Sequence, residues 1–242
     1  MKKRLDLLLV ERKIFLTRTN AQVHILSGEV FVNSEKVLAS SKLIDVEAKI
    51  EIKLLKDNFV SRGGLKLEKA IKSFDINPEG LICLDVGAST GGFTDCLLKK
   101  GASKVYCVDV GYGQLDYKLR NNTKVINFEK LNARYIKKDL INDEIDIIVM
   151  DVSFISITKF EDFFKEFSSK TNTFLGLIKP QFELTPEKIG KNGIVRNQSY
   201  RDQAIERVYT FINSFYENIS GPIESPIKGT KGNVEYLIAG KN

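Results

Sequence analysis

Histidine and cysteine are scarce in this sequence, which limits the metal chemistry it can support. The 242 residues include one histidine, His24, and three cysteines, Cys83, Cys96 and Cys107. The cysteines lack the spacing of metal ligands and cannot all form disulfides, so we expect reduced, buried thiols. We therefore expect no metal site. His24 has apolar neighbours in a predicted helix, and we expect it to be structural.

Long apolar segments are also missing. No stretch approaches the ~18 consecutive apolar residues of a membrane span. The N-terminal segment MKKRLDLLLVERK starts like a secretion signal, but its apolar run ends at Glu11 and Arg12, and no small-residue cleavage site follows. These features predict a cytoplasmic protein without stable membrane association.

The charge is unbalanced toward the basic side. The chain has 37 Lys and Arg against 31 Asp and Glu, a formal net charge of +6. This excess favours a polyanionic partner, although by itself it identifies none.

The first part of the chain, residues 1–58, predicts a small α+β domain. Residues 4–12 and 17–28 have the pattern of two short amphipathic helices. A hairpin over residues 29–37 and an alternating strand over residues 49–55 follow. Several basic residues precede or line the helices. They form either an ordinary solvated face or a surface for a polyanion.

The second domain, residues 65–242, follows a predicted connector at residues 59–64. After a helix at residues 65–74, nearly continuous apolar strands alternate with helices, which predicts a parallel sheet covered on both faces. The last two predicted strands, residues 223–227 and 234–239, are joined by too short a loop for a parallel crossover and must form an antiparallel hairpin at the sheet edge. This α/β layout resembles that of class I, Rossmann-like methyltransferases.

A glycine-rich turn, DVGASTGGFTD, follows the first of these strands. Gly87, Gly91 and Gly92 allow a tight bend and close approach of a ligand. About twenty residues later Asp109 ends the next strand, where a carboxylate can accept the hydroxyls of a ribose. The turn fits the dinucleotide pattern G-x-G-x-x-G poorly, and Asp85 and Asp95 would repel a pyrophosphate. The turn therefore favours S-adenosylmethionine, whose sulfonium and amino groups are cationic.

Four charged residues are predicted at the carboxyl edge of the sheet. Asp151 and Lys179 end apolar strands, Glu235 opens the last strand, and Lys66 lies in the helix before the first strand. Ionised groups at the ends of buried strands need partners, and strand-end salt bridges would account for any one of them. Four at one edge indicate acid–base chemistry, in which a lysine beside carboxylates helps a weakly acidic alcohol to react.

Two resemblances follow from these motifs. The order RLD, TRTNAQ and G-x-V-x-VN resembles the S-four-type RNA-binding fold over about the first fifty residues. The blocks SRGGLKL, DVGASTGGFTD, VDVGYGQL, LNAR, DVSFIS, KPQFE and KG-x-VEY resemble, over the whole chain, the TlyA family. That family joins an S-four-type module to an FtsJ-like ribose 2′-O-methyltransferase domain.

The resemblance implies roles for named residues. Lys66, Asp151, Lys179 and Glu235 would be the catalytic Lys-Asp-Lys-Glu tetrad. The S-adenosylmethionine site would comprise Asp85, Gly87, Ser89, Thr90, Gly91, Gly92, Phe93, Asp109, Asn132 and Asp151. Asn132 replaces an aspartate that is common in FtsJ-like relatives. The residues expected to face RNA are Arg4, Lys13, Arg18 and Arg62.

The implied partner is ribosomal RNA. The implied substrate is the ribose of a cytidine in the RNA of the small ribosomal subunit, the large one or both. Three alternatives remain open at this point. The first is a membrane-active haemolysin, a name the family also carries. The second is an RNA-binding protein with a vestigial methyltransferase fold, and the third is a methyltransferase for proteins or small molecules.

Overall fold

The computed structural model describes residues 2–15, 17–26, 28–52 and 59–242. Its contacts divide the chain into two compact units, Met1–Arg62 and Gly63–Asn242, and each is described by itself. The division lies within the predicted connector, residues 59–64. The predicted end of the first domain, at residue 58, lies outside the described residues.

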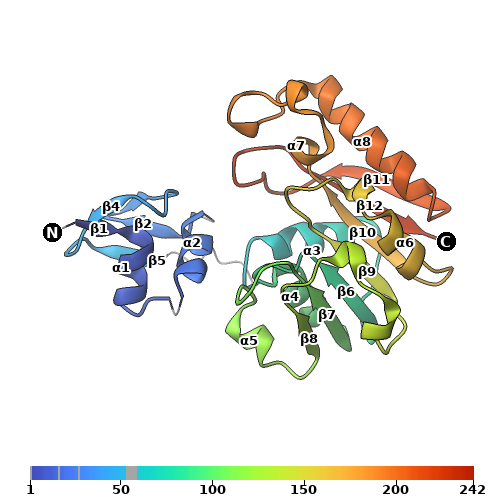
Figure 1. Cartoon of the computed structure of the whole chain (residues 1–242), viewed down its shortest axis with the longest axis horizontal. Coiled ribbons are helices and arrows are strands. Elements are labelled where there is room, and N and C mark those ends of the chain that lie inside the picture. The colour runs from blue at the N-terminus through green and yellow to red at the C-terminus, as the bar shows by residue number, and fades with distance from the viewer. Residues whose placement is uncertain (1, 16, 27, 53–58) are drawn as a thin grey trace. The chain divides into compact units, whose positions relative to one another are not determined.

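The first unit contains the two predicted helices and two small sheets (Figure 1). The sheets are β1–β4 and β3–β2–β5, and the hairpin between β2 and β3 turns at Asn33 and Ser34, which both have positive φ. Apolar side chains from both helices and from β2 form a separate core. The unit thus has the predicted α+β composition, with an unpredicted strand β1 before the first helix. Its elements are β1 (Lys2–Arg4), α1 (Leu5–Glu11), α2 (Arg18–Leu26), β2 (Val30–Val32), β3 (Glu35–Lys36), β4 (Leu43–Asp45) and β5 (Ile50–Ile52).

The second unit is built on a seven-stranded sheet in the order β11-β12-β10-β9-β6-β7-β8 (Figure 1). β12 runs antiparallel to both of its neighbours, and the remaining adjacent pairs are parallel. The predicted α/β sheet is therefore confirmed. Its strands are β6 (Ile82–Val86), β7 (Lys104–Val108), β8 (Val125–Phe128), β9 (Ile147–Met150), β10 (Thr173–Ile178), β11 (Asn218–Glu224) and β12 (Tyr236–Lys241).

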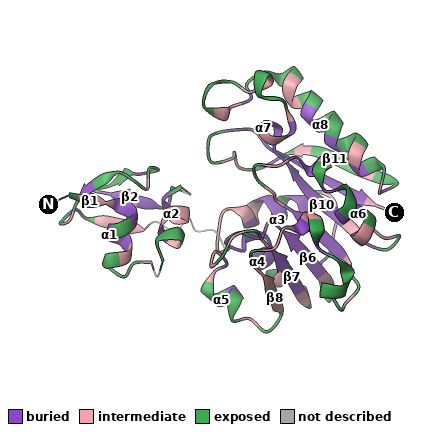
Figure 2. Ribbon diagram, in the orientation of Figure 1, coloured by how far each residue is buried: buried purple, intermediate pink, exposed green. Residues whose placement is uncertain are grey.

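Helices cover both faces of this sheet because alternate strand residues point to opposite sides. On one face, Leu84, Ile148 and Phe174 pack with an aromatic cluster from α6 (Glu161–Phe167) and α8 (Gln198–Asn213). The other face contacts α3 (Gly63–Ser73) and α4 (Gly92–Lys99). Figure 2 shows the sheet as the most continuously buried part of this unit. The remaining helices are α5 (Tyr117–Arg120) and α7 (Pro180–Glu183), with short 3-10 turns at Ala133–Tyr135, Lys138–Leu140, Ile157–Lys159, Pro186–Lys188 and Lys191–Gly193.

Several element bounds differ from those predicted. The terminal strands were expected at residues 223–227 and 234–239, but β11 ends at Glu224 and β12 starts at Tyr236. Ser225 hydrogen-bonds to Ile227 across Pro226, and because proline cannot donate to a ladder, the strand stops before it. α3 starts at Gly63, two residues before the predicted start, so the last two residues of the predicted connector are helical.

Asp85 is a buried carboxyl group within the sheet. It lies on β6 under α4, is fully buried, and its Oδ2 accepts a hydrogen bond of 2.6 Å from Thr94 Oγ1. Oδ1 has no hydrogen-bond partner among the described residues. Burial raises the pKa of Asp85 to about 7, because the charged form is desolvated. The sheet therefore holds a carboxylic acid that ionises only near neutral pH.

This raised pKa predicts a pH-dependent stability. Between about pH 4 and pH 7 the unfolded chain releases the Asp85 proton and the folded chain keeps it, so the free energy of unfolding falls as pH rises. Asp85→Asn removes this dependence and keeps an acceptor for Thr94. Urea unfolding from pH 4 to pH 8 should show the variant gaining on the order of 4 kcal/mol relative to the wild type. Parallel stability curves for the two proteins would contradict the assignment.

Candidate functional site

The four charged residues predicted for the sheet edge meet in the structure. Asp151 directly follows β9 and Lys179 directly follows β10, so both lie at the carboxyl edge of the parallel strands. Glu235 precedes β12, and because β12 runs antiparallel, its start lies at the same edge. Lys66 reaches this edge from the first turns of α3. The sheet topology thus gathers residues that are far apart in the sequence.

These side chains form a continuous chain of opposite charges. Glu235 Oε2 lies 2.7 Å from Lys66 Nζ, which lies 3.8 Å from Asp151 Oδ2. Asp151 Oδ1 is 2.5 Å from Lys179 Nζ, and Lys179 Nζ also donates to Ser153 Oγ at 2.7 Å. Asp151 therefore lies between two ammonium groups, and each lysine is held by a carboxylate.

Asp151 is charged despite its burial. Burial by itself would raise its pKa, but the ammonium groups of Lys179 and Lys66 hold the pKa of Asp151 below its usual value. Lys66, Lys179 and Glu235 are all buried, with less than a tenth of their surface exposed. A buried arrangement of this kind fixes the lysine Nζ atoms in place.

The backbone of the loop before β12 lies close to the Glu235 carboxylate. A Cβ added to Gly229 would lie 2.5 Å from Glu235 Oε1, so a side chain at this position would displace the Glu235 carboxylate. In the same loop Asn233 accepts a hydrogen bond from Val195 N and donates one to Gly193 O. These contacts attach residues 193–196, with the sequence GIVR, to the loop that precedes β12.

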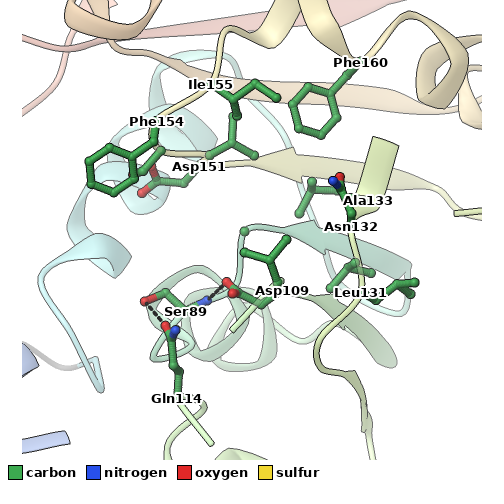
Figure 3. A pocket seen from close by; sticks show the side chains of 16 residues that line it. Ser89, Asp109, Gln114, Leu131, Asn132, Ala133, Asp151, Phe154, Ile155 and Phe160 are labelled. Atoms are coloured by element: carbon green, nitrogen blue, oxygen red, sulfur yellow. Dashed lines mark hydrogen bonds between the residues drawn. The ribbon is translucent and has the colours of Figure 1, made fainter. Parts of the chain in front are cut away.

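A cavity of about 370 Å³, here called the Asp109 cavity, opens beside Asp151. Figure 3 shows Ser89, Asp109 and Gln114 along one side of it and Asp151, Phe154 and Phe160 along the other. None of the described residues that line it is a lysine or an arginine, whereas two are aspartates. Its lining residues are Val86, Gly87, Ser89, Val108, Asp109, Val110, Gln114, Leu131, Asn132, Ala133, Asp151, Val152, Ser153, Phe154, Ile155 and Phe160.

Asp109 connects the two loops that border this cavity. Its Oδ2 accepts a hydrogen bond from Ser89 N at 2.8 Å, and its Oδ1 accepts one from Gly111 N at 2.7 Å. Ser89 Oγ donates to Gln114 Oε1 at 3.3 Å (Figure 3). Gly87 has φ +85°, and a Cβ there would lie 2.8 Å from Asp151 O. Only glycine therefore allows the first turn to lie against the loop after β9.

The predicted cofactor residues divide into two groups. Gly87, Ser89, Asp109, Asn132 and Asp151 line the Asp109 cavity. The other group shapes the turn from behind: it comprises Asp85 beneath α4 and the segment Thr90–Phe93, none of which lines the cavity. Asn132 uses its Oδ1 to accept from Arg134 N. Asp95, expected to add negative charge at the turn, is paired with Lys99 at 2.8 Å.

A second cavity of about 290 Å³, here called the Lys179 cavity, is lined by three of the four charged side chains, Lys66, Lys179 and Glu235. Ser153 and Phe154 line both cavities. Phe154 has φ +65° and 89% of its surface is exposed, and its ring lies 5.2 Å from that of Phe182. The residues that line the Lys179 cavity are Lys66, Ser153, Phe154, Lys179, Gln181, Phe182, Ile189, Gly193, Gly229, Thr230, Lys231, Asn233 and Glu235.

The basic residues predicted to face RNA lie in the first unit. Arg4 and Arg18 are partly exposed and both pair with Asp6. Lys13 is exposed and has φ +56°. Arg62 is half-buried at the end of the unit.

Sequence reasoning missed several residues that line the two cavities. Gln114, Ser153 and Phe154 lie in blocks that the sequence singles out, VDVGYGQL and DVSFIS, so their position beside predicted residues was a usable signal. Phe182 lines the Lys179 cavity and belongs to the same block as Lys179, KPQFE, so the same signal applied to it. Leu131, Ile155 and Phe160 are ordinary apolar residues with no such signal.

Among the described residues, no helix has the length and apolar character needed to cross a membrane.

Comparisons with known proteins point to one family. The sequence pattern of FtsJ-like methyltransferases matches residues 59–242. Hemolysin A of Brachyspira hyodysenteriae is 48% identical over 91% of this chain and 92% of its own length. The 16S/23S rRNA (cytidine-2′-O)-methyltransferase TlyA of Mycobacterium tuberculosis is 35% identical over 97% of this chain and 88% of its own length.

Solved structures agree. A structure named as a hemolysin, from Streptococcus thermophilus, has a TM-score of 0.76 and 39% identity, covering 100% of this chain and 89% of its own. A SAM-dependent methyltransferase of Aquifex aeolicus shares the fold, with a TM-score of 0.50 and 20% identity over 75% of this chain and 93% of its own.

The buried pair of Lys66 and Glu235 predicts a strong energetic coupling. Replacing one partner leaves a buried charge without compensation. The destabilisations of Lys66→Met and Glu235→Gln should therefore add up to more than the destabilisation of the double variant. Denaturant unfolding of the single and double variants should give a coupling of about 3 kcal/mol. The exposed pair Lys165–Glu161 is the control and should couple far more weakly. Equal coupling in the two pairs would show that burial does not strengthen the site.

Proposed function

Because the chain belongs to the FtsJ-like methyltransferase family, and within it resembles relatives named TlyA, we propose that it methylates the ribose 2′-hydroxyl of a cytidine in ribosomal RNA. The methyl donor is S-adenosylmethionine, and the substrate is rRNA in one or both ribosomal subunits. We place this activity in the cytoplasm, where ribosomal subunits are found.

The observation that carries this proposal is the opposite charge of two adjoining cavities. The Asp109 cavity is lined by aspartates and by no described lysine or arginine, which suits a cationic sulfonium and disfavours a pyrophosphate. The Lys179 cavity is lined by three lysines, Lys66, Lys179 and Lys231, against one carboxylate, Glu235, and this excess of positive charge suits a nucleotide with its phosphates. The cavities adjoin at Ser153 and Phe154, so a donor in one lies next to an acceptor in the other.

The residues present fit S-adenosylmethionine. Its ribose hydroxyls would be bound by Asp109, whose carboxylate is already oriented by Ser89 N and Gly111 N. Leu131, Ile155 and Phe160 give an apolar wall for the adenine, and Gly87 allows close approach of the backbone. When bound, S-adenosylmethionine supplies an electrophilic methyl group on a sulfonium.

Lys179 is the residue that would contact the reacting hydroxyl. A ribose hydroxyl is a poor nucleophile at neutral pH because its proton is tightly held. The Lys179 ammonium, held by Asp151 and Ser153, would donate a hydrogen bond to the attacking oxygen and stabilise its negative charge as the hydroxyl proton passes to solvent water. The oxygen would take the methyl group as the carbon–sulfur bond breaks, and the sulfonium would leave as a neutral thioether. Lys66 and Glu235 keep Asp151 oriented toward Lys179.

Phe154 would hold the base of the target nucleotide. An exposed phenyl ring at the junction of the cavities, backed by Phe182, offers a stacking surface for an unpaired base. The positive φ of Phe154 is strained for a side chain of this size, and strain of this kind is typical of functional positions.

A vestigial fold is the weaker alternative. It predicts a decayed charge cluster, but all four residues are present and paired at 3.8 Å or less.

The role of Lys179 predicts a selective loss of catalysis. Lys179→Ala should reduce the rate of methyl transfer to rRNA by about 10³-fold, because the developing oxyanion loses its donor. The affinity for S-adenosylmethionine should change little, since Lys179 does not line the Asp109 cavity. Transfer of tritiated methyl groups and calorimetric titration measure the two effects, with Lys165→Ala as a control for loss of one charge. Wild-type transfer by the Lys179 variant would refute the role.

The role proposed for Asp109 predicts the opposite pattern, in which cofactor affinity is lost. Asp109→Ala removes the acceptor for a ribose hydroxyl and frees the two loops that it joins, so calorimetry should show the affinity for S-adenosylmethionine falling by about 100-fold. Asp109→Asn keeps the shape and one acceptor oxygen and should lose less. Unchanged affinity in the alanine variant would place the cofactor elsewhere.

A further inference from the structure

We propose that Asp6 is a positioning residue that fixes Arg4 and Arg18 of the first unit as a paired binding site for an RNA phosphate. This inference rests on the proposed function, because it assumes that RNA is the partner. The sequence predicts that both arginines face RNA.

Asp6 is a fully buried carboxylate that accepts five hydrogen bonds. Oδ1 accepts from Arg4 Nε at 3.0 Å and from Leu7 N at 3.0 Å. Oδ2 accepts from Arg4 Nη2 and Arg18 Nε, both at 2.9 Å, and from Gln22 Nε2 at 2.8 Å. β1, α1 and α2 each contribute to this cluster, and the two guanidinium groups are neighbours because they share one oxygen.

The cluster leaves both guanidinium groups accessible. The Arg4 side chain is 38% exposed and the Arg18 side chain 51% exposed, whereas Asp6 is inaccessible. Among the described residues, Arg18 donates to Asp6 through Nε and Arg4 through Nε and Nη2, so the two terminal nitrogens of Arg18 and Nη1 of Arg4 can bind a ligand. A guanidinium fork of this kind matches the geometry of phosphate oxygens.

Other basic residues of this unit are used differently. Arg12 donates to the backbone oxygens of Ala48 and Val46, which holds the loop between β4 and β5. Lys3 pairs with Glu11, whose side chain is more than half exposed. In the part of this unit that the structure describes, Arg4 and Arg18 are the arginines whose guanidinium groups share a buried carboxylate.

The energetic argument is preorganisation. A free arginine loses side-chain entropy when it binds a phosphate, and here the buried carboxylate imposes that order before RNA arrives. Hydrogen bonding by Arg4 keeps the pKa of Asp6 well below its usual range, against the opposing effect of burial, so the anchor stays charged. Two cations and one anion leave a net positive site.

The test measures whether RNA affinity rises or falls when the negative charge of Asp6 is removed. Asp6→Asn removes one negative charge, so simple electrostatics predicts tighter RNA binding. If Asp6 positions the arginines, binding of a labelled RNA stem-loop to the full-length variant should instead weaken by about tenfold. The dependence of log affinity on log salt should become shallower by about one unit. Glu11→Gln is the matched control, since it removes the same charge from an exposed pair in the same unit, and it should bind as well as the wild type or better.

A second variant separates positioning from folding. Arg18→Lys keeps the charge and a partner for Asp6 but loses the guanidinium fork, so it should retain the wild-type thermal unfolding profile and still lose about tenfold in RNA affinity. Wild-type affinity in Arg18→Lys, or tighter binding in Asp6→Asn, would overturn the proposal.

The binding assay separates this proposal from the proposed function. S-adenosylmethionine affinity, which reports on the second unit, should be unchanged in all of these variants. If the wild-type protein binds the stem-loop with this mutational pattern but transfers no methyl group to rRNA, the proposed function fails and the phosphate site stands. If transfer occurs and the pattern is absent, the phosphate site fails alone.

Discussion

The second unit depends on one constraint: Asp151 must remain ionised between two lysines at the end of a buried strand. A buried carboxylate tends to take up a proton, as Asp85 does one strand away. Asp151 avoids this because Lys66 and Lys179 lie within 3.8 Å of it. The same pairing holds both ammonium groups in the wall of the Lys179 cavity, while Asp151 lines the neighbouring Asp109 cavity. The contacts that keep Asp151 ionised therefore also fix the positions of the two lysines.

The contrast between Asp85 and Asp151 shows how neighbours set the properties of identical side chains. Asp85 lies within β6 and is fully buried, whereas Asp151 directly follows the neighbouring strand β9 and is half-buried. One faces a threonine hydroxyl under α4, and the other faces two cations at the edge. The first is suited to shaping the glycine turn, and the second to holding charge beside a reacting oxygen. Asp6 in the first unit follows the second pattern, with arginines in place of lysines.

The sequence predicted much of this arrangement, and its failures have physical causes. Asp151 and Lys179 lie at one edge because the carboxyl ends of parallel strands coincide, and Glu235 joins them because it opens a strand of the opposite direction. The segment Thr90–Phe93 stays a prediction: it does not line the Asp109 cavity, and a motif alone does not define which side of a turn faces a cavity. Phe160 and Leu131 line the Asp109 cavity through packing between distant elements, which no local pattern encodes. The strand bounds near residue 225 were misjudged because Pro226 was read as part of a strand.

The position of β12 has a consequence for how the protein is made. This strand follows β10 and β11 in the chain yet lies between them, and Glu235 stands immediately before it. During synthesis the ribosome must therefore release almost the entire second unit before the sheet can close and Lys66 can meet its carboxylate. Incomplete nascent chains hold the glycine turn and Asp109 but lack the closed charge cluster. Under the proposed function, the order of the strands thus assembles the cofactor turn before the charge cluster that would carry methyl transfer.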